Sequence, residues 1–284
     1  MIIKRRRIGD KSEIKSVPIH NGYDPMVREL RMVSGSFYLP KDNGLKPDGE
    51  DASFMCRVDQ VVGVADGVGS WALKGIDAGE YARQLMRNCV ATIESKDSRN
   101  YKFGRINLKR VLKQAYANTK VEGSSTACLL SLSGSKLHAV NLGDSGFMVL
   151  REGIVVYQSP LQQHCFNCPY QLGNHQNSDK PSSAQELEVE VKSGDIIVAA
   201  TDGLLDNAFL WEIERAINFQ LGRHQKSNAV IDPEMIAMDL VELALYNAYD
   251  EFKDTPFSSA AKQAGKKHTG GKIDDITVVV SFVL

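Results

Sequence analysis

The chain carries the run Val61-Val62-Gly63-Val64-Ala65-Asp66-Gly67, in which apolar residues end in a carboxylate and a glycine. An apolar run of this length, closed by a turn signal, is typical of a buried strand. Two more runs share this character, Ile196-Ile197-Val198-Ala199-Ala200-Thr201-Asp202-Gly203 and Asp274-Asp275-Ile276-Thr277-Val278-Val279-Val280. Strands of one core deliver their end residues to a common rim, so the three strand-end aspartates are predicted to converge. Convergent carboxylates suit hard cations such as Mg²⁺ or Mn²⁺.

Composition sets broad limits on the protein class. The 284 residues are 43% hydrophobic and 24% charged, which is ordinary for a globular protein with a sizeable core. No apolar run approaches the roughly 18 residues that would span a bilayer, so we expect a soluble protein without a transmembrane segment. The net charge of −1 gives no argument for nucleic acid as a partner. We divide the chain into a basic, flexible N-terminal segment (1–34) and one domain (35–284).

The N-terminal segment and the cysteines bear on the compartment. Basic residues outnumber acidic ones within 1–15, and Lys4–Arg7 form a run that suits a nuclear-import patch, an organelle-targeting remnant or, by preference, a solvated terminus. Five cysteines without a secretory signal indicate a reducing compartment and free thiols. Cys165 and Cys168 form a Cys-x-x-Cys motif, but no second pair completes a zinc site. A loop or packing role is therefore favoured there over metal or redox chemistry.

Apolar residues recurring every three and four positions predict helices at 77–95, 108–119, 209–220 and 232–252. Asp77 and Asp232 are the expected N-caps, with Pro233 in the first turn of the last helix. The segment 255–272 is rich in Ser, Ala, Gly and Lys and is predicted to be a loop.

Short apolar runs with glycine turns predict a β-meander over 125–132, 137–142, 147–151 and 154–158. Such short connections imply antiparallel pairing. The runs 187–191, 196–201 and 276–283 continue the sheet, with the last one central and buried. Strands grouped around helix pairs, without a βαβ rhythm, indicate an α+β layered fold.

Six motifs occur in a fixed order over the chain, and together they resemble the metal-dependent serine/threonine phosphatase family of type 2C. They are Gly49-Glu50-Asp51-Ala52, Gly63-Val64-Ala65-Asp66-Gly67-Val68-Gly69, Ser124-Ser125-Thr126-Ala127, Leu142-Gly143-Asp144-Ser145-Gly146, Ala200-Thr201-Asp202-Gly203-Leu204-Leu205-Asp206 and Asp274-Asp275-Ile276-Thr277. The resemblance implies a four-layer αββα sandwich, in which two antiparallel sheets are flanked by helix pairs and a dimetal site lies at one end.

The resemblance also implies roles for individual residues. Asp66 would bridge two Mn²⁺ or Mg²⁺ ions, the Gly67 carbonyl would bind one of them, and Asp202 with Asp274 would complete the protein ligands of the other. The matching position makes Glu50 and Asp51 acids that hold metal-bound waters. Asp144 and Asp206 match acids that assist a third, weaker ion in some members of the family.

The implied reaction is hydrolysis of phosphoserine and phosphothreonine by a metal-activated water, with no phosphoenzyme. Two cations would neutralise the phosphoryl oxygens and align the attacking water. No cysteine is followed by arginine at the Cys-x5-Arg spacing of a thiol nucleophile loop, which agrees with this chemistry.

Three positions depart from the family pattern. Val68 stands where many members have a histidine thought to protonate the leaving alkoxide. A metal-bound water, His164 or another group would then donate the proton, or turnover is slow. Lys46 matches an arginine that holds the substrate phosphate, although a surface role for this lysine is as well supported. Asp275 replaces an asparagine and is interpreted as a turn residue or a support for the ligands.

The expected function is therefore a phosphoprotein phosphatase, and the alternative is a weak or inactive pseudophosphatase that binds phosphoproteins. The substrate partner is a phosphoprotein, no nucleic acid is expected, and we expect a monomer. Three segments, Gly67-Val68-Gly69-Ser70-Trp71, Phe166-Asn167-Cys168-Pro169-Tyr170-Gln171-Leu172 and Gly270-Gly271-Lys272-Ile273-Asp274-Asp275, look most like the Ptc-seven branch. That branch suggests a mitochondrion or plastid, with cytoplasm or nucleus as the alternative because the N-terminal segment is a poor transit peptide.

Overall fold

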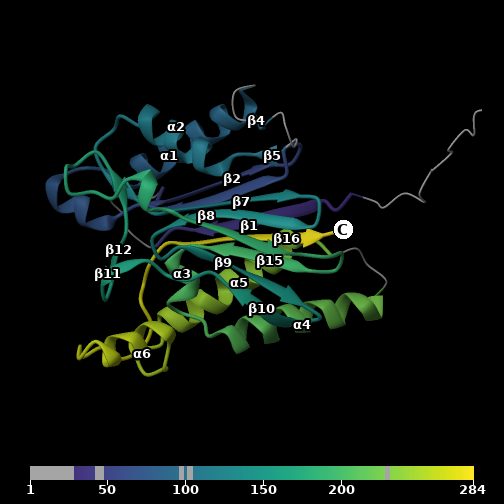
Figure 1. Cartoon of the computed structure of the whole chain (residues 1–284). Coiled ribbons are helices and arrows are strands. Elements are labelled where there is room, and N and C mark those ends of the chain that lie inside the picture. Colours follow the sequence, from purple (N-terminus) through teal and green to yellow (C-terminus); the bar gives the residue numbers. More distant parts are fainter. Residues whose placement is uncertain (1–28, 42–47, 96–98, 101–104, 228–230) are drawn as a thin grey trace, which may run out of the picture.

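Two five-stranded antiparallel sheets lie face to face in the middle of the molecule (Figure 1). The computed structural model describes residues 29–41, 48–95, 99–100, 105–227 and 231–284. The first sheet has the order β14-β8-β7-β3-β2, formed by Gln185–Glu190, Lys136–Leu142, Ala127–Ser133, Val61–Asp66 and Asp51–Cys56. The second has the order β1-β16-β15-β9-β10, formed by Met32–Leu39, Ile276–Val283, Ile196–Ala200, Gly146–Arg151 and Ile154–Gln158.

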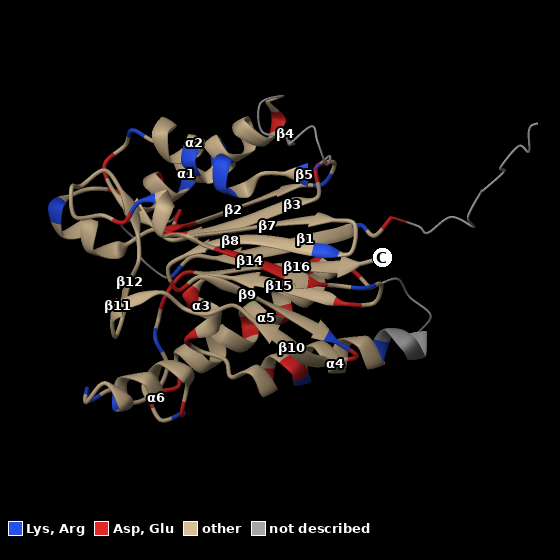
Figure 2. Cartoon of the chain, viewed as in Figure 1, with Lys and Arg blue, Asp and Glu red and all other residues tan. Residues whose placement is uncertain are grey.

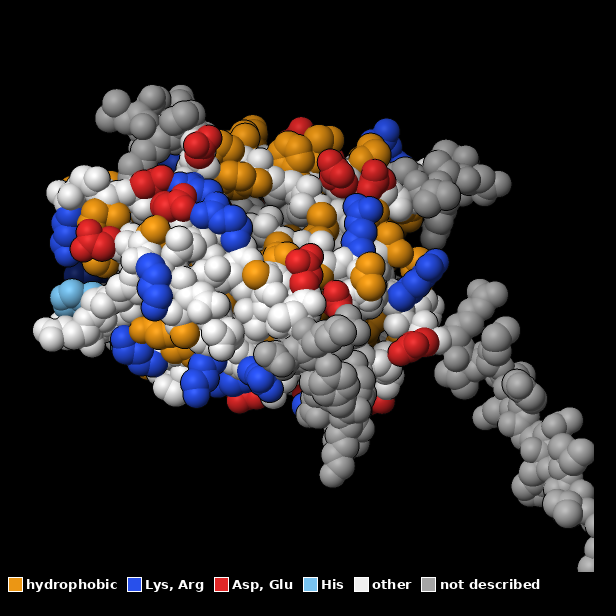
Figure 3. Space-filling model, turned by 90° about the horizontal axis from the view of Figure 1, so that it is seen from above, with side chains coloured by type: hydrophobic (Ala, Val, Ile, Leu, Met, Phe, Trp, Pro, Cys, Tyr) orange, Lys and Arg blue, Asp and Glu red, His pale blue; other side chains and the backbone are white. Residues whose placement is uncertain are grey.

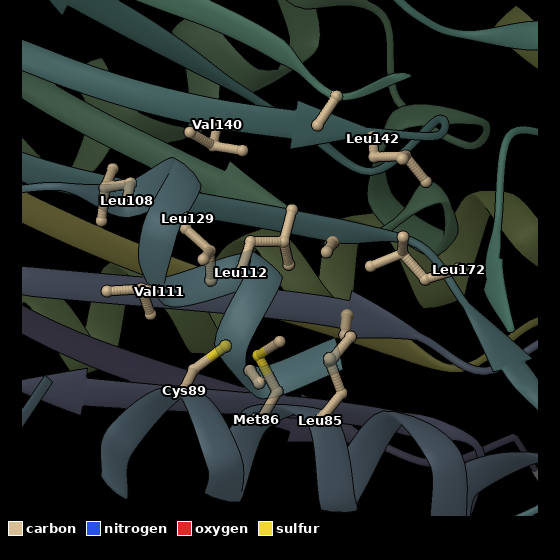
Figure 4. Close-up of a cluster of buried hydrophobic side chains, with 14 of the residues drawn as sticks. Leu85, Met86, Cys89, Leu108, Val111, Leu112, Leu129, Val140, Leu142 and Leu172 are labelled. Carbon is tan, nitrogen blue, oxygen red and sulfur yellow. The ribbon is translucent and has the colours of Figure 1, made fainter. Parts of the chain in front are cut away.

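Helix pairs cover the outer faces of both sheets. Helices α1 (Ala78–Glu94) and α2 (Leu108–Asn118) pack on the first sheet, and Figure 4 shows Leu85 and Cys89 of α1, Leu112 of α2 and Leu129 of β7 in one buried cluster. Helices α4 (Leu210–Ser227) and α5 (Pro233–Ala248) pack on the second sheet. The four layers confirm the predicted αββα sandwich.

The continuous apolar character of β3 follows from burial on both of its faces. Val61 and Ala65 belong to the cluster that faces α1 and α2, whereas Val62 and Val64 belong to the cluster between the two sheets. Alternate residues of a strand point to opposite faces, so a strand in an inner layer needs apolar residues at every position. This is why Val61–Asp66 has no polar residue before its terminal aspartate.

The strands of the predicted meander are confirmed, but the prediction that they form one sheet is wrong. β7 pairs with β8 in the first sheet, whereas β9 pairs with β10 in the second. The chain crosses between the sheets at Gly143, whose φ of 107° is open to glycine alone. The same crossing occurs between β14 and β15. Apolar runs mark strands but do not say which sheet each strand joins.

The prediction of a loop over 255–272 is also wrong in part, because Pro256–Gln263 form helix α6. The helix begins with a capping box, in which the side chains of Thr255 and Ser258 each accept from the backbone N–H of the other. Pro256 occupies the first turn, and Phe257 and Ala261 are buried. The short helix projects below α3 and α5 at the end of the sandwich where α3 begins (Figure 1).

The remaining helices agree with prediction except at their ends. Asp77 caps α1 by accepting from the Gly79 N–H, and Asp232 caps α5 by accepting from the Glu234 N–H. α4 continues to Ser227, beyond the predicted end at 220, and α5 stops at Ala248, before the predicted end at 252.

Strand β1 was not expected, and it begins at Met32, inside the segment assigned to the N-terminus. Met32 pairs with Val283 of β16, and Ser34 pairs with Ser281. Lys4–Arg7 lie outside the described residues.

Short elements complete the fold. They are α3 (Asp202–Leu205), the 3₁₀ turns Gly69–Lys74 and Pro181–Ser183, and the two-stranded pairs β4-β5 (Arg99–Asn100, Arg105–Ile106), β6-β13 (Ser124–Ser125, Leu172–Gly173) and β11-β12 (Gln163–Cys165, Cys168–Pro169).

Two surface properties concern the kind of partner. Within the part of the chain that the structure describes, no helix is long and apolar enough to cross a membrane. Basic and acidic side chains are interspersed on the face that Figure 3 shows, which looks onto the α1 and α2 layer.

Candidate metal centre

The three predicted strand-end aspartates lie at one end of the sandwich, where both sheets finish. Asp66 is the last residue of β3 in the first sheet, Asp202 begins α3 directly after β15 of the second, and Asp274 precedes β16. Figure 2 shows acidic residues gathered at this end, beside α3. Residues more than two hundred positions apart thus meet because antiparallel neighbours bring a strand end beside a strand start.

The first group of carboxylates combines Asp66, Asp144 and Asp202. Their ligand oxygens lie within 4.8 Å of one another. Asp144 follows β8 at the crossing between the sheets, which places it beside residues from both. The structure therefore brings Asp144, predicted for a third ion, beside Asp66 and Asp202, which are predicted to be metal ligands.

The second group combines Glu50, Asp274 and Asp275, whose ligand oxygens also lie within 4.8 Å of one another. Asp275 is 1% exposed and accepts from the Tyr38 hydroxyl at 3.0 Å and from the Lys41 backbone N–H at 3.1 Å. It is thus a member of the acidic group and not merely a turn residue.

Two lysines that the sequence did not single out cover these groups. The Lys272 ammonium bonds Asp202 and lies 3.1 Å from carboxylate oxygens of both Asp206 and Asp274. Lys41 Nζ lies 2.7 Å from Glu50, 2.9 Å from Asp274 and 3.4 Å from Asp275. Asp274 therefore lies between two lysine ammonium groups. Lys272 also contacts Asp202 of the first group, and Lys41 also contacts Glu50 of the second.

Asp51 lies beneath the groups as their buried support. It faces Asp66 in the register of β2 with β3, and its Oδ2 accepts from the hydroxyls of Thr201 at 2.8 Å and Thr277 at 2.7 Å. Those two threonines also join β15 to β16, because the Thr277 N–H donates to Thr201 Oγ1 at 3.0 Å. Asp51 thus ties both sheets together directly below the acids.

The backbone around Asp66 is held by the Ser124-Ser125-Thr126 segment. The Asp66 N–H donates to Thr126 Oγ1 at 3.0 Å, and the Thr126 N–H donates to the Asp66 carbonyl at 2.9 Å. Gly67 is required here by close approach, since a Cβ on it would lie 2.4 Å from the Ala78 carbonyl oxygen and 2.5 Å from that of Glu50. The Gly67 N–H donates to the Glu50 carbonyl at 3.1 Å.

Burial and mutual repulsion perturb the acids in the same direction. Burial, then the Asp202 charge, raises the pKa of Asp66 well above its usual value, and burial with the Asp275 charge does the same to the pKa of Asp51. Burial and neighbouring Asp202 raise the pKa of Asp144 to about 6. Burial likewise raises the pKa of Asp206 to about 7, although the Lys272 ammonium opposes it.

Asp274 is the exception, in keeping with its place between the lysines. Burial alone would raise its pKa, but the ammonium groups of Lys272 and Lys41 outweigh burial and lower it. The reciprocal effect raises the pKa of Lys272 well above its ordinary value, against the opposing effect of burial. Charge compensation therefore depends on both lysines.

The donor set fits hard divalent ions. All the side-chain oxygens that converge here and could bind a metal ion belong to carboxylates, the ligands that Mg²⁺ and Mn²⁺ prefer. Among the described residues, the buried Oδ1 atoms of Asp51, Asp144 and Asp202 have no hydrogen-bond partner. A buried acceptor without a hydrogen-bond partner lowers the stability of the fold. The lysine ammoniums at both groups show that each group already accommodates a positive charge.

The structure also bears on the expected substrate contacts. Lys46 lies outside the described residues. His164, considered as a substitute proton donor, stacks on Tyr170 and places Nε2 3.0 Å from Asp179 Oδ2. Val68 follows Gly67 and is half-buried, with its N–H donating to the Ser124 carbonyl at 3.0 Å.

A cavity of about 260 Å³ opens beside the acids. Asp144 and Asp206 line its polar end, and Phe166, Phe257 and Leu161 contribute an apolar wall. Phe166 of the β11-β12 hairpin and Phe257 of α6 lie with ring centroids 5.0 Å apart. The overlooked helix α6 thus builds one side of the space next to the site.

Comparison with known proteins gives a consistent picture. Residues 48–230 match the family model described as Protein phosphatase 2C. The chain is 49% identical over 256 residues to "Probable protein phosphatase 2C 55" of Arabidopsis thaliana, covering 90% of this chain and 52% of that protein. It therefore spans about half the length of this plant relative. It is 37% identical to "Protein phosphatase PTC7 homolog" of Danio rerio, covering 90% of each chain.

Solved structures show the same fold. The photosystem II phosphatase PBCP superposes with a TM-score of 0.79 at 30% identity, covering 89% of this chain and 99% of that one. The catalytic domain of the serine threonine protein phosphatase PstP, solved in complex with two manganese ions, superposes with a TM-score of 0.58 at 20% identity, covering 90% and 99%.

Proposed function

The chain belongs to the protein phosphatase 2C family, and we propose that it is a metal-dependent phosphatase acting on phosphoserine and phosphothreonine in proteins. The observation that supports this most directly is the pair of carboxylate groups that share the end of the sandwich, each already holding an ammonium. A site that binds two cations and opens into a cavity suits a phosphate monoester, whose dianion repels nucleophiles until its charge is neutralised.

We assign Asp66, the Gly67 carbonyl, Asp202 and Asp274 as the metal ligands. Asp66 and Asp202 share the first group, and Lys272 contacts Asp202 and Asp274 with one ammonium, which supports a single cation taking both. Asp144 and Asp206 flank the cavity and are assigned to a third, weaker ion. Mn²⁺ or Mg²⁺ bound there would supply an activated water and neutralise the phosphoryl charge.

The protein's own groups would orient and complete this site. Glu50 and Asp51 hold positions beside and below the ligands, where they would accept from metal-bound waters and keep the ligands aligned. The threonine hydroxyls on Asp51 keep that carboxylate in place. Val68 supplies no proton, so the leaving group's proton would come from solvent or a bound water.

The substrate would reach the acids through the cavity between the β11-β12 hairpin and α6. Its polar end would receive the phosphate side, and the Phe166 and Phe257 wall would contact neighbouring residues of the phosphoprotein. Lys46 is proposed to bind the substrate phosphate.

The test is phosphate release from a phosphoserine peptide and from p-nitrophenyl phosphate. Activity is expected with Mn²⁺ or Mg²⁺, is abolished by EDTA, and falls roughly 100-fold or more in Asp66→Asn and in Asp202→Asn. Calorimetric titration of Mn²⁺ provides a second readout, because both variants should bind it more weakly. Asp232→Asn is the matched control, since asparagine also caps helices and Asp232 is exposed on α5. Metal-independent turnover that survives both site variants would refute the mechanism.

A pseudophosphatase remains the second candidate because Val68 replaces a proton donor. General-acid assistance is worth typically about 10²–10⁴-fold, so its loss alone could leave a binding protein with little turnover. Mn²⁺ binding without hydrolysis of any peptide in a phosphoserine and phosphothreonine panel would favour this function.

For the compartment we propose an organelle, on the resemblance to the Ptc-seven branch. A fluorescent fusion of the whole chain, compared with a fusion starting at Glu29, tests whether the residues before Glu29 act as a targeting signal. The shorter chain keeps all of β1, so a change in location would not reflect a damaged sheet.

A further inference from the structure

The Cys-x-x-Cys motif forms the tip of a two-residue hairpin beside the site. Cys165 ends β11 and Cys168 begins β12, and the two cysteines face each other in the register. Phe166 and Asn167 make the turn, in which Asn167 adopts a φ of 54° that asparagine tolerates well. The spacing that matches a metal motif in the sequence is therefore a cross-strand pair in the fold.

This placement has the geometry that a disulfide needs. Directly opposed residues of antiparallel strands have Cα atoms about 4.5–5.5 Å apart. Disulfides span Cα separations of about 4.4–6.8 Å. Burial, followed by the neighbouring Cys165 thiol, raises the pKa of Cys168. Little backbone movement would be needed to join the sulfurs.

Access separates Cys165 from the other thiols. Cys165 is exposed, Cys168 and Cys56 are half-buried, and Cys89 and Cys128 are fully buried. Burial also raises the pKa of Cys128 to about 12 and that of Cys56 to about 11, which disfavours the reactive thiolate at both positions. Cys165 is thus the thiol best placed to meet a reagent from solution.

We propose that Cys165 and Cys168 form a reversible disulfide that reports the thiol redox state of the surroundings. The Cys165 thiolate attacks a sulfur of an external disulfide, either oxidised glutathione or an oxidised dithiol protein, and releases one thiol. Cys168 then gives up its proton and attacks the Cys165 sulfur of the mixed disulfide, which releases the second thiol. The protein's dithiol is oxidised by two electrons, and the external disulfide is reduced to two thiols.

The bond would be readily reversed. It closes only the short turn between adjacent strands, so it removes little conformational freedom from the unfolded chain. An exposed disulfide with little stabilisation behind it is easily reduced. This is the behaviour of a regulatory bond and not of a structural one.

The hairpin is connected to the metal centre through its neighbours. Gln163 Nε2 donates to Asp144 Oδ2 at 2.8 Å, and Phe166 contacts Phe257 in the wall of the cavity. Closing the disulfide restricts the turn that carries Phe166, so oxidation is expected to raise KM for phosphopeptides several-fold and to alter p-nitrophenyl phosphate hydrolysis much less. This consequence rests on the proposed phosphatase function, whereas disulfide formation does not.

The experiment incubates the full chain in glutathione buffers of increasing oxidation, alkylates free thiols without unfolding, and maps the peptides by mass. The peptide containing both cysteines should lose two alkylation sites together and two hydrogens in mass, and dithiothreitol should restore both. Cys165→Ser and Cys168→Ser should each prevent the intramolecular bond. The matched control Cys56→Ser alters a thiol outside the hairpin and should leave the transition unchanged.

Three outcomes would overturn the proposal. One is two free thiols at every ratio of oxidised to reduced glutathione. Another is oxidation that gives only glutathione adducts or linked chains. The third is a zinc ion retained by the pair in native mass spectrometry and lost in both serine variants, which would assign metal binding instead. Because the mass readout needs no turnover, a failure here is distinct from a failure of the phosphatase assay.

Discussion

Lys272 is the residue whose role is most open to a direct test, because its ammonium stands where a divalent ion would compete. Its contacts with Asp202, Asp206 and Asp274 compensate three carboxylates at once. Lys272→Met should therefore lower the free energy of unfolding of the metal-free protein by about 2–4 kcal/mol, since the carboxylates lose their partner. The same change should tighten Mn²⁺ binding, because the ion no longer displaces an ammonium.

Thermal denaturation in EDTA and calorimetric titration of Mn²⁺ measure the two effects. Arg151→Met is the matched control, because Arg151 bonds the buried Asp195 at 2.7 Å at the opposite end of β15 from Asp202. It should destabilise the protein without changing Mn²⁺ affinity. Equal Mn²⁺ affinity in Lys272→Met and the unaltered chain would contradict competition.

At this scale the sequence predicted the acids better than the bases. Asp66, Asp144, Asp202, Glu50 and Asp274 do come together, although their metal roles stay a prediction. An apolar run ending in Asp marks where a strand delivers a charge, so such residues can be found by pattern. Lys41 and Lys272 lie in connecting segments, and only the folded path shows that their long side chains reach the acids.

Helix α6 begins at a buried cap that a single substitution can test. Thr255 bonds the Ser258 N–H at 3.2 Å, and its hydroxyl donates to the Gly270 carbonyl at 3.0 Å. Thr255→Ala should cost about 1–2 kcal/mol, because a buried cap is lost together with a bond to the next loop. Thr255→Ser keeps the hydroxyl and should recover most of the loss. Chemical denaturation compares the three proteins, and equal midpoints for all of them would show that the cap carries no stability.

The same element shows why part of the fold escaped prediction. Composition favoured a loop, since Ser, Ala, Gly and Lys dominate 255–272. The local signals, a Thr-Pro-x-Ser cap and buried Phe257, favoured a helix and proved decisive. Likewise, the strands of the meander were predictable from their apolar runs. Their division between two sheets was not, because it depends on the crossing at Gly143.

For the whole molecule, the buried acids oppose folding unless protons or cations neutralise them. The folded-state pKa is about 6 for Asp144 and about 7 for Asp206, above the ordinary value of 3.8, so the folded protein binds more protons than the unfolded one between these values. The stabilisation that comes from protonating Asp144 and Asp206 is complete below the ordinary aspartate pKa of 3.8, and it is lost as the pH rises through 6 to 7. Metal-free protein should thus melt at a lower temperature as the pH rises from about 5 to 8.

The expected size is on the order of 1–3 kcal/mol for Asp206, or several degrees in Tm for a chain of this length. Asp206→Asn removes one of the titrating carboxyls, so its metal-free Tm should depend less on pH over the same interval. Saturating Mn²⁺ should remove or reverse the trend, because the ions favour the ionised acids. Differential scanning calorimetry at matched ionic strength tests this. A metal-free Tm that rises with pH, unchanged by Asp206→Asn, would mean that Lys272 and Lys41 alone neutralise the site and that the acids await no further cation.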